Sequence, residues 1–198
     1  LGFQRAGFDI VAAFEVWEVA ANCYEQNFDH PVFRTDLSNT QEAISIISEL
    51  SPDVIIGGPP CQDFSFAGKR IEAGRASLTG SFSEIVTAIR PRYFVMENVD
   101  RARNSNAYAF ARENFKSAGY GLTEVVLDAS KCGTPQKRKR FFCIGALGKE
   151  DGFAHKIVIG EDGKPTCEYM DANGNISTGD YDLVPVLESF IQEHPDFS

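Results

Sequence analysis

Residues 53–65 read Asp-Val-Ile-Ile-Gly-Gly-Pro-Pro-Cys-Gln-Asp-Phe-Ser, and this stretch is the most informative part of the chain. Its apolar run, 53–56, predicts a buried strand, and the glycines and prolines that follow predict a rigid loop at the carboxyl end of that strand. In an open α/β sheet, this end is the edge where ligands bind. Cys61 stands on the loop, and there it is either a nucleophile or a small apolar filler.

Strands and helices alternate along the rest of the chain. Apolar runs predict short strands at 10–14, 53–56, 93–96, 122–129 and 140–147, and helical spacing predicts helices over 16–28, 40–50, 77–90 and 104–118. Residues 62–76 have little periodicity and predict a loop. Alternating elements with short connections indicate an α/β fold, in which a mostly parallel sheet carries helices on both faces.

Composition and cysteine content narrow the class of protein. The 198 residues are 43% apolar and 24% charged, which is typical of one globular domain with or without a fragment of another. No apolar stretch is long enough to cross a bilayer. The five cysteines contain no Cys-x-x-Cys pair, and the three histidines lie far apart. We therefore expect reduced thiols, a cytoplasmic location, no metal and no membrane partner.

Negative charge is concentrated at the end of the chain. Residues 150–198 hold eleven acidic residues against Lys156 and Lys164, which equals the net charge of −9 of the whole chain. Residues 1–149 are neutral overall, and 51–149 are basic, which predicts a local anionic partner. Within the acidic segment, Asp162-Gly163 and Asn173-Gly174 predict hairpin turns, and 183–192 predict a last helix.

Polar side chains that could bind a ligand or take part in catalysis occur at the predicted strand ends. Glu15 and Asp36 follow the first two strand-like segments, Glu97 follows strand 93–96, and a cationic cluster over 136–140 opens the last strand. Carboxylates at strand ends accept hydrogen bonds from a ribose diol or an adenine amine, although a single acid can also simply cap a loop. Arg138 and Arg140 are two residues apart, so in an extended chain their side chains would project to the same side. Alternatively, they belong to a solvated face.

The motifs together resemble a known family. Gly-Pro-Pro-Cys-Gln-x-Phe-Ser, Glu-Asn-Val and Gln-Lys-Arg-x-Arg, in this order and at these spacings, resemble the DNA (cytosine-5)-methyltransferases over roughly residues 1–149. The resemblance implies a Rossmann-like, doubly wound methyltransferase fold, with S-adenosyl-L-methionine as cofactor and duplex DNA as partner. The family's opening Phe-x-Gly-x-Gly motif would precede Leu1. We therefore expect a partial catalytic core over 1–149, followed at 150–198 by an acidic tail that begins a target-recognition region or forms a linker.

The resemblance also implies a catalytic mechanism. The thiolate of Cys61 would attack C6 of a flipped-out cytosine, which makes C5 reactive enough to accept a methyl group. Glu97, protonated or sharing a proton, would meet N3 and N4 of the base. Arg140 would hold O2 of the base, and Arg138 would support the thiol loop.

Two further sets of residues are implied by the same resemblance. Glu15 and Asp36 would bind the cofactor, and Val16 and Leu37 would sandwich its adenine. The full set of expected cofactor-binding residues is Glu15, Val16, Asp36, Leu37, Pro59 and Leu78. The expected substrate-binding residues are Pro60, Gln62, Ser65, Asn98, Val99 and Gln136.

Three other interpretations remain open at this stage. A tRNA cytosine-5 methyltransferase would carry nearly the same motifs. A catalytically silent binding module would keep the fold, although the joint presence of Cys61, Glu97, Arg138 and Arg140 argues against it. A nicotinamide-dependent oxidoreductase would need Gly-x-Gly-x-x-Gly after the first strand, which the sequence does not show. The motifs fit a nucleoid-associated prokaryotic enzyme, and they distinguish neither restriction–modification from housekeeping methylation nor one oligomeric state from another.

Overall fold

The chain divides into two units, which are described separately. The computed structural model describes residues 1–60, 78–131, 135–153, 157–159, 165–170 and 176–180. Unit 1 comprises Leu1–Ile10, Leu127–Lys139 and Ala154–Ser198, and unit 2 comprises Val11–Val126 and Arg140–Phe153. Among the described helices, none is long and apolar enough to cross a membrane.

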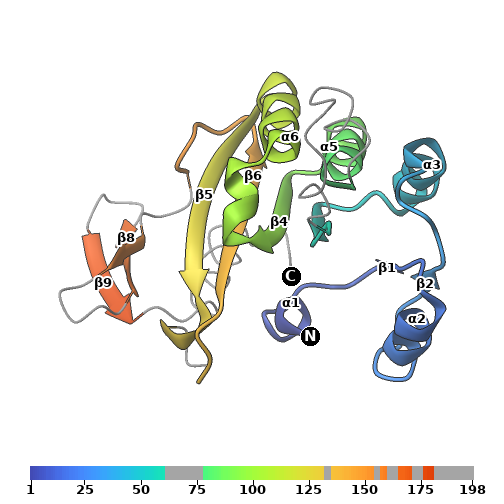
Figure 1. Ribbon diagram of the computed structural model, residues 1–198, viewed down its shortest axis with the longest axis horizontal. Coiled ribbons are helices and arrows are strands. Elements are labelled where there is room, and N and C mark those ends of the chain that lie inside the picture. The colour runs from blue at the N-terminus through green and yellow to red at the C-terminus, as the bar shows by residue number, and fades with distance from the viewer. Residues whose placement is uncertain (61–77, 132–134, 154–156, 160–164, 171–175, 181–198) are drawn as a thin grey trace. The chain divides into compact units, whose positions relative to one another are not determined.

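A four-stranded sheet forms the centre of unit 2 (Figure 1). Its strands lie in the order β3 (Val54–Gly57), β4 (Tyr93–Val99), β6 (Lys139–Leu147) and β5 (Tyr120–Asp128). β3 and β4 are parallel, which confirms the expected α/β class, whereas β6 runs antiparallel to β4. β6 follows β5 after only residues 129–138, and a parallel return would need a longer crossover connection.

The first part of unit 2 forms a second sheet, which has two strands. β1 (Ala13–Phe14) and β2 (Val32–Phe33) pair in parallel, and α2 (Glu18–Glu25) connects them. The rings of Phe14 and Phe33, which are opposite each other in the ladder, stack with their centroids 5.2 Å apart. α2 is shorter than the expected helix over 16–28, since Trp17 has an extended backbone and caps its start.

The helices of unit 2 begin and end close to the positions that their periodicity predicts. They are α3 (Thr40–Leu50), α5 (Leu78–Ile89) and α6 (Asn106–Ser117), and α5 packs against both of the others. The short 3₁₀ helix η1 (Asp100–Asn104) leads into α6. Ser105 caps α6, because its hydroxyl accepts a hydrogen bond from the Tyr108 N–H at 3.0 Å. α3 ends at Ser51, which has a left-handed backbone (φ 48°) and precedes Pro52.

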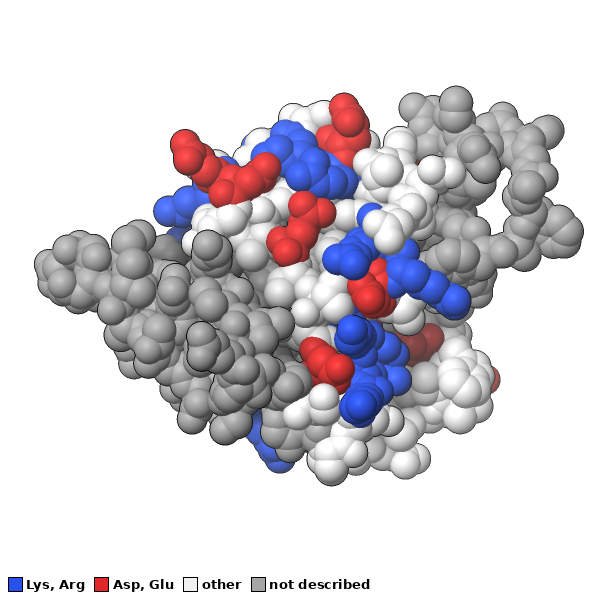
Figure 2. All heavy atoms as spheres, turned by 60° about the vertical axis from the view of Figure 1, so that its left-hand side comes forward, with Lys and Arg blue, Asp and Glu red and all other residues white. Residues whose placement is uncertain are grey.

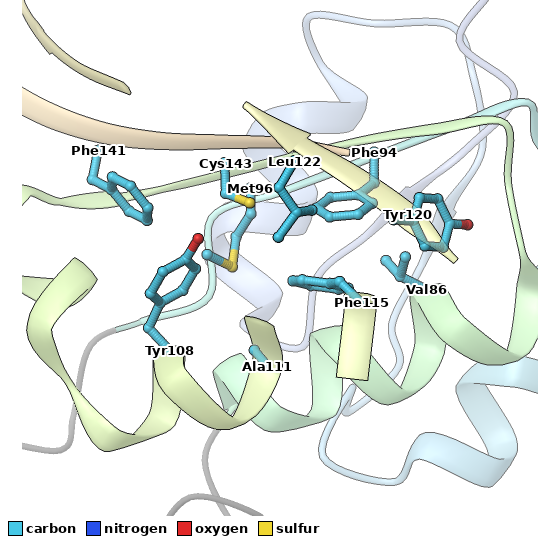
Figure 3. Close-up of a cluster of buried hydrophobic side chains, with 10 residues drawn as sticks. All are labelled: Val86, Phe94, Met96, Tyr108, Ala111, Phe115, Tyr120, Leu122, Phe141 and Cys143. Carbon is cyan, nitrogen blue, oxygen red and sulfur yellow. The ribbon is translucent and has the colours of Figure 1, made fainter. Parts of the chain in front are cut away.

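An apolar core lies between the sheet and the helices α5 and α6 (Figure 3). Phe94 and Phe115 are fully buried at its centre, with ring centroids 4.2 Å apart. The remaining buried members are Val86, Met96, Tyr108, Ala111, Tyr120, Leu122, Phe141 and Cys143. A smaller cluster of Ala43, Ile47 and Ile85 joins α3 to α5.

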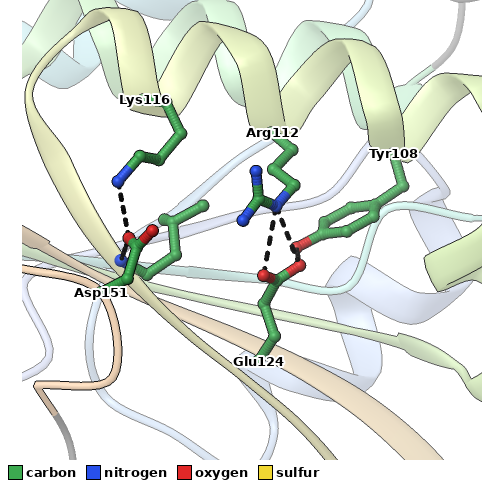
Figure 4. Close-up of polar contacts among 6 residues, drawn as sticks. Tyr108, Arg112, Lys116, Glu124 and Asp151 are labelled. Atoms are coloured by element: carbon green, nitrogen blue, oxygen red, sulfur yellow. Dashed lines mark hydrogen bonds and ion pairs between the residues drawn. The ribbon is translucent and has the colours of Figure 1, made fainter.

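Polar contacts fasten one face of α6 to the sheet (Figure 4). Tyr108, Arg112 and Lys116 are spaced four residues apart, so they lie on one side of the helix. The Tyr108 hydroxyl donates to Glu124 Oε1 at 2.5 Å, and Arg112 Nε lies 3.1 Å from Glu124 Oε2. Lys116 Nζ lies 2.6 Å from Asp151 Oδ1, which also accepts the Leu122 N–H at 2.8 Å. The Lys116 hydrogen bond, followed by that of Leu122, holds the pKa of Asp151 below its usual value.

Charges of both signs alternate on this side of the molecule. Figure 2 shows basic and acidic side chains interspersed on the face it draws. Among the described residues, ion pairs join Arg112 to Glu124, Lys116 to Asp151 and Arg103 to Asp100. Arg103 and Arg112 thus pair with acidic residues of the segment 51–149 itself, whereas Lys116 pairs with Asp151, which lies outside it.

Unit 1 contains helix α1 (Gly2–Arg5), the 3₁₀ helix η2 (Ala129–Lys131) and a three-stranded sheet. The sheet consists of β7 (Ile157–Ile159), β8 (Pro165–Met170) and β9 (Ile176–Asp180), which pair antiparallel in sequence order. This antiparallel pairing agrees with the hairpins expected in the acidic tail, although the expected turns at 162–163 and 173–174 lie outside the described residues. The predicted loop 62–76 and the predicted helix 183–192 lie outside the described residues.

We predict that Gly145→Ala destabilises the protein. Gly145 is opposite Phe94 in the β4–β6 ladder, and a Cβ there would lie 2.0 Å from Phe94 Cε1. Overpacking of this kind costs about 1–3 kcal/mol. Urea denaturation measures the loss. The matched control is Gly2→Ala on α1, where a Cβ would meet nothing within 4 Å. An equal loss in both variants would contradict the role given to Gly145.

We also predict a pH-dependent effect of Asp151→Asn. Because the pKa of Asp151 is lowered in the folded state, its carboxylate stabilises the fold above the unfolded-state value of about 3.9, and this contribution disappears as the pH falls through the lowered value. Denaturation at neutral pH should show the variant to be less stable than the parent, and the difference should vanish in acid. Glu113→Gln is the control, because it removes the same charge from exposed α6 surface without breaking the Lys116–Asp151 pair.

Candidate active site

The carboxyl ends of β3 and β4 lie side by side and carry two of the motifs found in the sequence. Gly57 of β3 is opposite Met96 of β4 in the parallel ladder. The next residues along the two chains, Gly58 and Glu97, therefore lie at the same edge of the sheet. A Cβ on Gly58 would lie 3.4 Å from Glu97 Oε2. A Cβ at this position would be in ordinary van der Waals contact with the carboxyl group, so the backbone of Gly58 itself passes close to Glu97.

Asn98 connects these two strand ends directly. Its Nδ2 donates to the carbonyl oxygen of Pro59 at 2.9 Å, and its Oδ1 accepts the Val99 N–H at 2.8 Å. The residue is 5% exposed. The substrate contact expected for Asn98 is not tested by this geometry, but both ends of its amide already bind within the protein.

Arg140 reaches the same edge from β6. In the antiparallel ladder Glu97 is opposite Phe142, so Arg140 is its diagonal neighbour on the same face of the sheet. Arg140 Nε lies 2.7 Å from Glu97 Oε1, and the two side chains are 23% and 38% exposed, respectively. The structure thus brings together the acid and one of the two guanidinium groups that the sequence singled out.

Arg138 and Gln136 belong to unit 1, where both are exposed. The main chain of Arg138 is fixed by its N–H, which donates to Asp128 Oδ1 at 3.2 Å, and by its carbonyl, which accepts the Ala129 N–H at 3.0 Å. Ser130 donates to the same carboxylate and lowers the pKa of Asp128. The expected roles of Arg138 and Gln136 remain predictions.

The two acids expected to bind the cofactor lie at one edge of the small sheet. Phe14 is opposite Phe33 in the parallel β1–β2 pair, so the chain leaves both strands on the same side toward Glu15 and Asp36. Glu15 Oε1 accepts the Trp17 N–H at 2.8 Å. Asp36 Oδ1 accepts the Ser38 N–H at 2.9 Å, which lowers the pKa of Asp36 and keeps it ionised near neutral pH.

The other residues expected at the cofactor differ in exposure. Val16 is 63% exposed beside Glu15, whereas Leu37 is half-buried and packs against the cluster that joins α3 to α5. Leu78 begins α5 and is half-buried. At the end of β3, Pro59 is half-buried and Pro60 is exposed.

Cys61, Gln62 and Ser65 lie outside the described residues. The free thiols that the structure describes are Cys23, which is exposed, and Cys143, which is fully buried. Burial raises the pKa of Cys143 to about 12, so this sulfur is a protonated core atom and not a nucleophile. Within the described part of the chain, no group of three or more His, Cys, Asp or Glu side chains could hold a metal ion.

Comparison with known proteins identifies the family. A sequence model of the C-5 cytosine-specific DNA methylases matches residues 1–177. The chain belongs to this family. The match continues past residue 149 into β9, so the division of the chain at 149 stays a prediction.

The relatives include two bacterial type II methyltransferases. M.HindV of Haemophilus influenzae is 54% identical over 77% of this chain and 51% of its own length. M.HgiDI of Herpetosiphon aurantiacus is 56% identical over 73% of this chain and 47% of its own length. The chain therefore spans about half the length of these relatives.

Solved structures agree with the fold. A putative DNA modification methyltransferase encoded within a prophage of E. coli superposes with a TM-score of 0.60 at 30% identity, over 74% of this chain and 42% of the other. A DNMT2 mutant from Spodoptera frugiperda superposes with a TM-score of 0.64 at 25% identity, over 75% and 46%. The expected partial Rossmann-like methyltransferase fold is confirmed.

The structure also shows contacts that sequence patterns did not reveal. The hydrogen bond from Asn98 to Pro59 joins residues 39 positions apart, and no periodicity signals it. The approach of Gly58 to Glu97 had one available signal, the paired glycines after an apolar strand.

The contrast between the two described thiols gives a test. We predict that iodoacetamide at mildly alkaline pH alkylates Cys23 in the folded protein and spares Cys143, because Cys143 is buried and its pKa is about 12. Peptide mass spectrometry measures both sites. Addition of urea should make Cys143 as reactive as Cys23, and rapid alkylation of Cys143 without urea would contradict its position in the core.

Proposed function

We propose that the whole protein transfers a methyl group from S-adenosyl-L-methionine to C5 of cytosine in duplex DNA. The observation that supports this most strongly is the pair Glu97–Arg140, which presents a carboxyl group and a guanidinium 2.7 Å apart at the strand end next to the Gly-Gly-Pro-Pro-Cys sequence. Membership of the C-5 cytosine-specific family and the type II relatives agree with it.

The pair is chemically complementary to one edge of cytosine. Cytosine has an acceptor at O2, an acceptor at N3 and an amine donor at N4. Arg140 donates to O2, while Glu97 gives a proton or hydrogen bond to N3 and accepts one from N4. The ion pair between the two residues must loosen as the base enters, because the same atoms then serve the base. Reaching this position requires that the nucleotide be flipped out of the duplex.

Cys61 supplies the nucleophile in this proposal. Its thiolate forms a bond to C6, and the electron pair of the C5–C6 double bond moves onto C5, helped by Glu97 at N3. The bound cofactor supplies the methyl group that C5 takes up. Loss of the C5 proton to a base and expulsion of the sulfur then restore the aromatic ring and the free thiolate.

The two acids of the small sheet fit the cofactor. Glu15 and Asp36 leave the same edge of the β1–β2 pair, and ionised carboxylates there can accept hydrogen bonds from a ribose diol. Val16 and Leu37 are proposed on either side of the adenine, with Pro59 and Leu78 nearby. The DNA contacts are proposed at Pro60, Gln62, Ser65, Val99 and Gln136, and Arg138 is proposed to support the thiol loop.

The remaining assignments follow from the same proposal. Residues 1–149 form the catalytic core, and 150–198 begin the target-recognition region. We place the protein in the cytoplasm of a prokaryote, in contact with the nucleoid. The type II names of the relatives favour a role in restriction–modification over housekeeping methylation.

A covalent trap tests the reaction. Full-length protein, cofactor and a duplex containing 5-fluorocytosine should give a complex that survives denaturing gels, because fluorine at C5 blocks the step that releases the sulfur. Cys61→Ser should abolish the complex, whereas Cys23→Ser, which removes the exposed thiol of α2, should leave it intact. Persistence of the adduct in Cys61→Ser would overturn the assignment of the nucleophile.

Two further experiments test the proposed cofactor site and the choice of DNA over RNA. Glu15→Gln should require more cofactor to reach the same extent of trapping, since it removes one of the two charges proposed to bind the ribose. Folded tRNA carrying 5-fluorocytosine should give no complex, and efficient trapping on tRNA alone would move the substrate from DNA to RNA.

A further inference from the structure

The link between Asn98 and Pro59 carries an inference beyond the proposed function. Pro59 and Pro60 have no N–H group, so this part of the chain cannot hold itself in place by donating hydrogen bonds from its own backbone. Its carbonyl groups must therefore find donors elsewhere when they are shielded from water. The amide of Asn98 provides that donor for Pro59, at 2.9 Å.

The position of Asn98 makes this contact rigid. The residue is in β4, 5% exposed, and its other amide atom accepts the N–H of Val99 at 2.8 Å. This second bond fixes which end of the amide faces Pro59, because Oδ1 is already turned toward Val99. The next residue back along β4 is Glu97, and the next residue back from Pro59 is Gly58, whose Cβ position lies 3.4 Å from Glu97 Oε2.

We infer that Asn98 is a positioning residue, whose amide holds the Pro59–Pro60 peptide at a fixed distance from Glu97. The inference rests on the proposed methyl transfer to cytosine, because the chain that leaves Pro60 leads to Cys61. With φ fixed at both prolines, anchoring the Pro59 carbonyl limits the directions that the chain can take after Pro60. Asn98 therefore acts on the reaction through the loop and does not bind the base.

A conservative substitution separates positioning from base binding. Asn98→Asp keeps the shape and the acceptor for Val99, but it places an oxygen against the Pro59 carbonyl where the wild type has a donor. Asn98→Ala removes both contacts. The matched control is Asn104→Asp, which adds the same charge at an exposed position of η1.

We expect Asn98→Asp in the full-length protein to slow single-turnover trapping on 5-fluorocytosine DNA by about 100-fold, the usual cost of a misplacement of about 1 Å. Dissociation constants for DNA and cofactor should change far less than this rate, because Asn98 itself touches neither ligand and the proposed contacts of Pro59 and Pro60 are only two of several. Asn104→Asp should resemble the wild type in all three measurements.

The pH profile gives a signature that a general loss of structure would not produce. A carboxyl group facing a carbonyl oxygen is stabilised in its protonated form, in which its O–H can donate to Pro59. The trapping rate of Asn98→Asp relative to wild type should therefore rise as the pH is lowered from about 8 to about 6. Asn98→Ala has no donor at any pH and should show no such recovery.

Hydrogen exchange makes the inference testable even without the chemistry. In the wild type and Asn104→Asp, the peptide containing Gly57 and Gly58 should exchange slowly, and in Asn98→Asp it should exchange at least about tenfold faster, as expected when a buried hydrogen bond is lost. If the wild type forms no trapped complex but this difference in exchange is seen, the proposed function fails and the anchoring role of Asn98 stands.

Two results would overturn the inference. Unchanged exchange at Gly57 and Gly58 in Asn98→Asp would show that the amide does not hold the loop. A loss of DNA affinity for 5-fluorocytosine duplexes, with the trapping rate at saturation unchanged, would show that Asn98 binds the substrate instead.

Discussion

The parallel ladder between β3 and β4 is the constraint on which the rest of this structure depends. It brings the Gly-Gly-Pro-Pro end of one strand beside the Glu-Asn-Val end of the next, and the candidate site is built on that juxtaposition. Antiparallel β6 then carries Arg140 to Glu97 through a diagonal contact. A shift of β3 by one residue would reverse the faces of its side chains and separate these groups.

The apolar core keeps the ladder in register. Phe94 lies in β4, packs on Phe115 of α6 and covers Gly145 of β6, so one aromatic side chain joins three elements beneath the site. Along one side of α6, the contacts of Tyr108, Arg112 and Lys116 bind the helix to β5 and Asp151. The strands that carry the candidate site are thus held in place by the apolar core, while the residues of the site stay partly exposed.

Much of this arrangement could be predicted from the sequence, because strand ends and helix faces leave periodic signals. The apolar run before Gly57, the acid after strand 93–96 and the helix over 40–50 are local patterns, and the structure confirms the elements that they indicate. The reversed direction of β6 was not predicted, since the strand pattern alone does not encode direction. The interaction of Asn98 with Pro59 depends on the pairing of two strands, which no local pattern reveals; the resemblance to the family suggested a substrate contact instead.

The two prolines also have a consequence for how the sheet assembles. A backbone nitrogen without hydrogen cannot take part in a ladder, so Pro59 and Pro60 cannot slide into the positions that Val54–Gly57 occupy against Tyr93–Met96. Any slippage of β3 toward its amino end would sacrifice bonds without replacing them. The same residues that shape the loop therefore act as a stop that prevents the strand from slipping toward its amino end during folding.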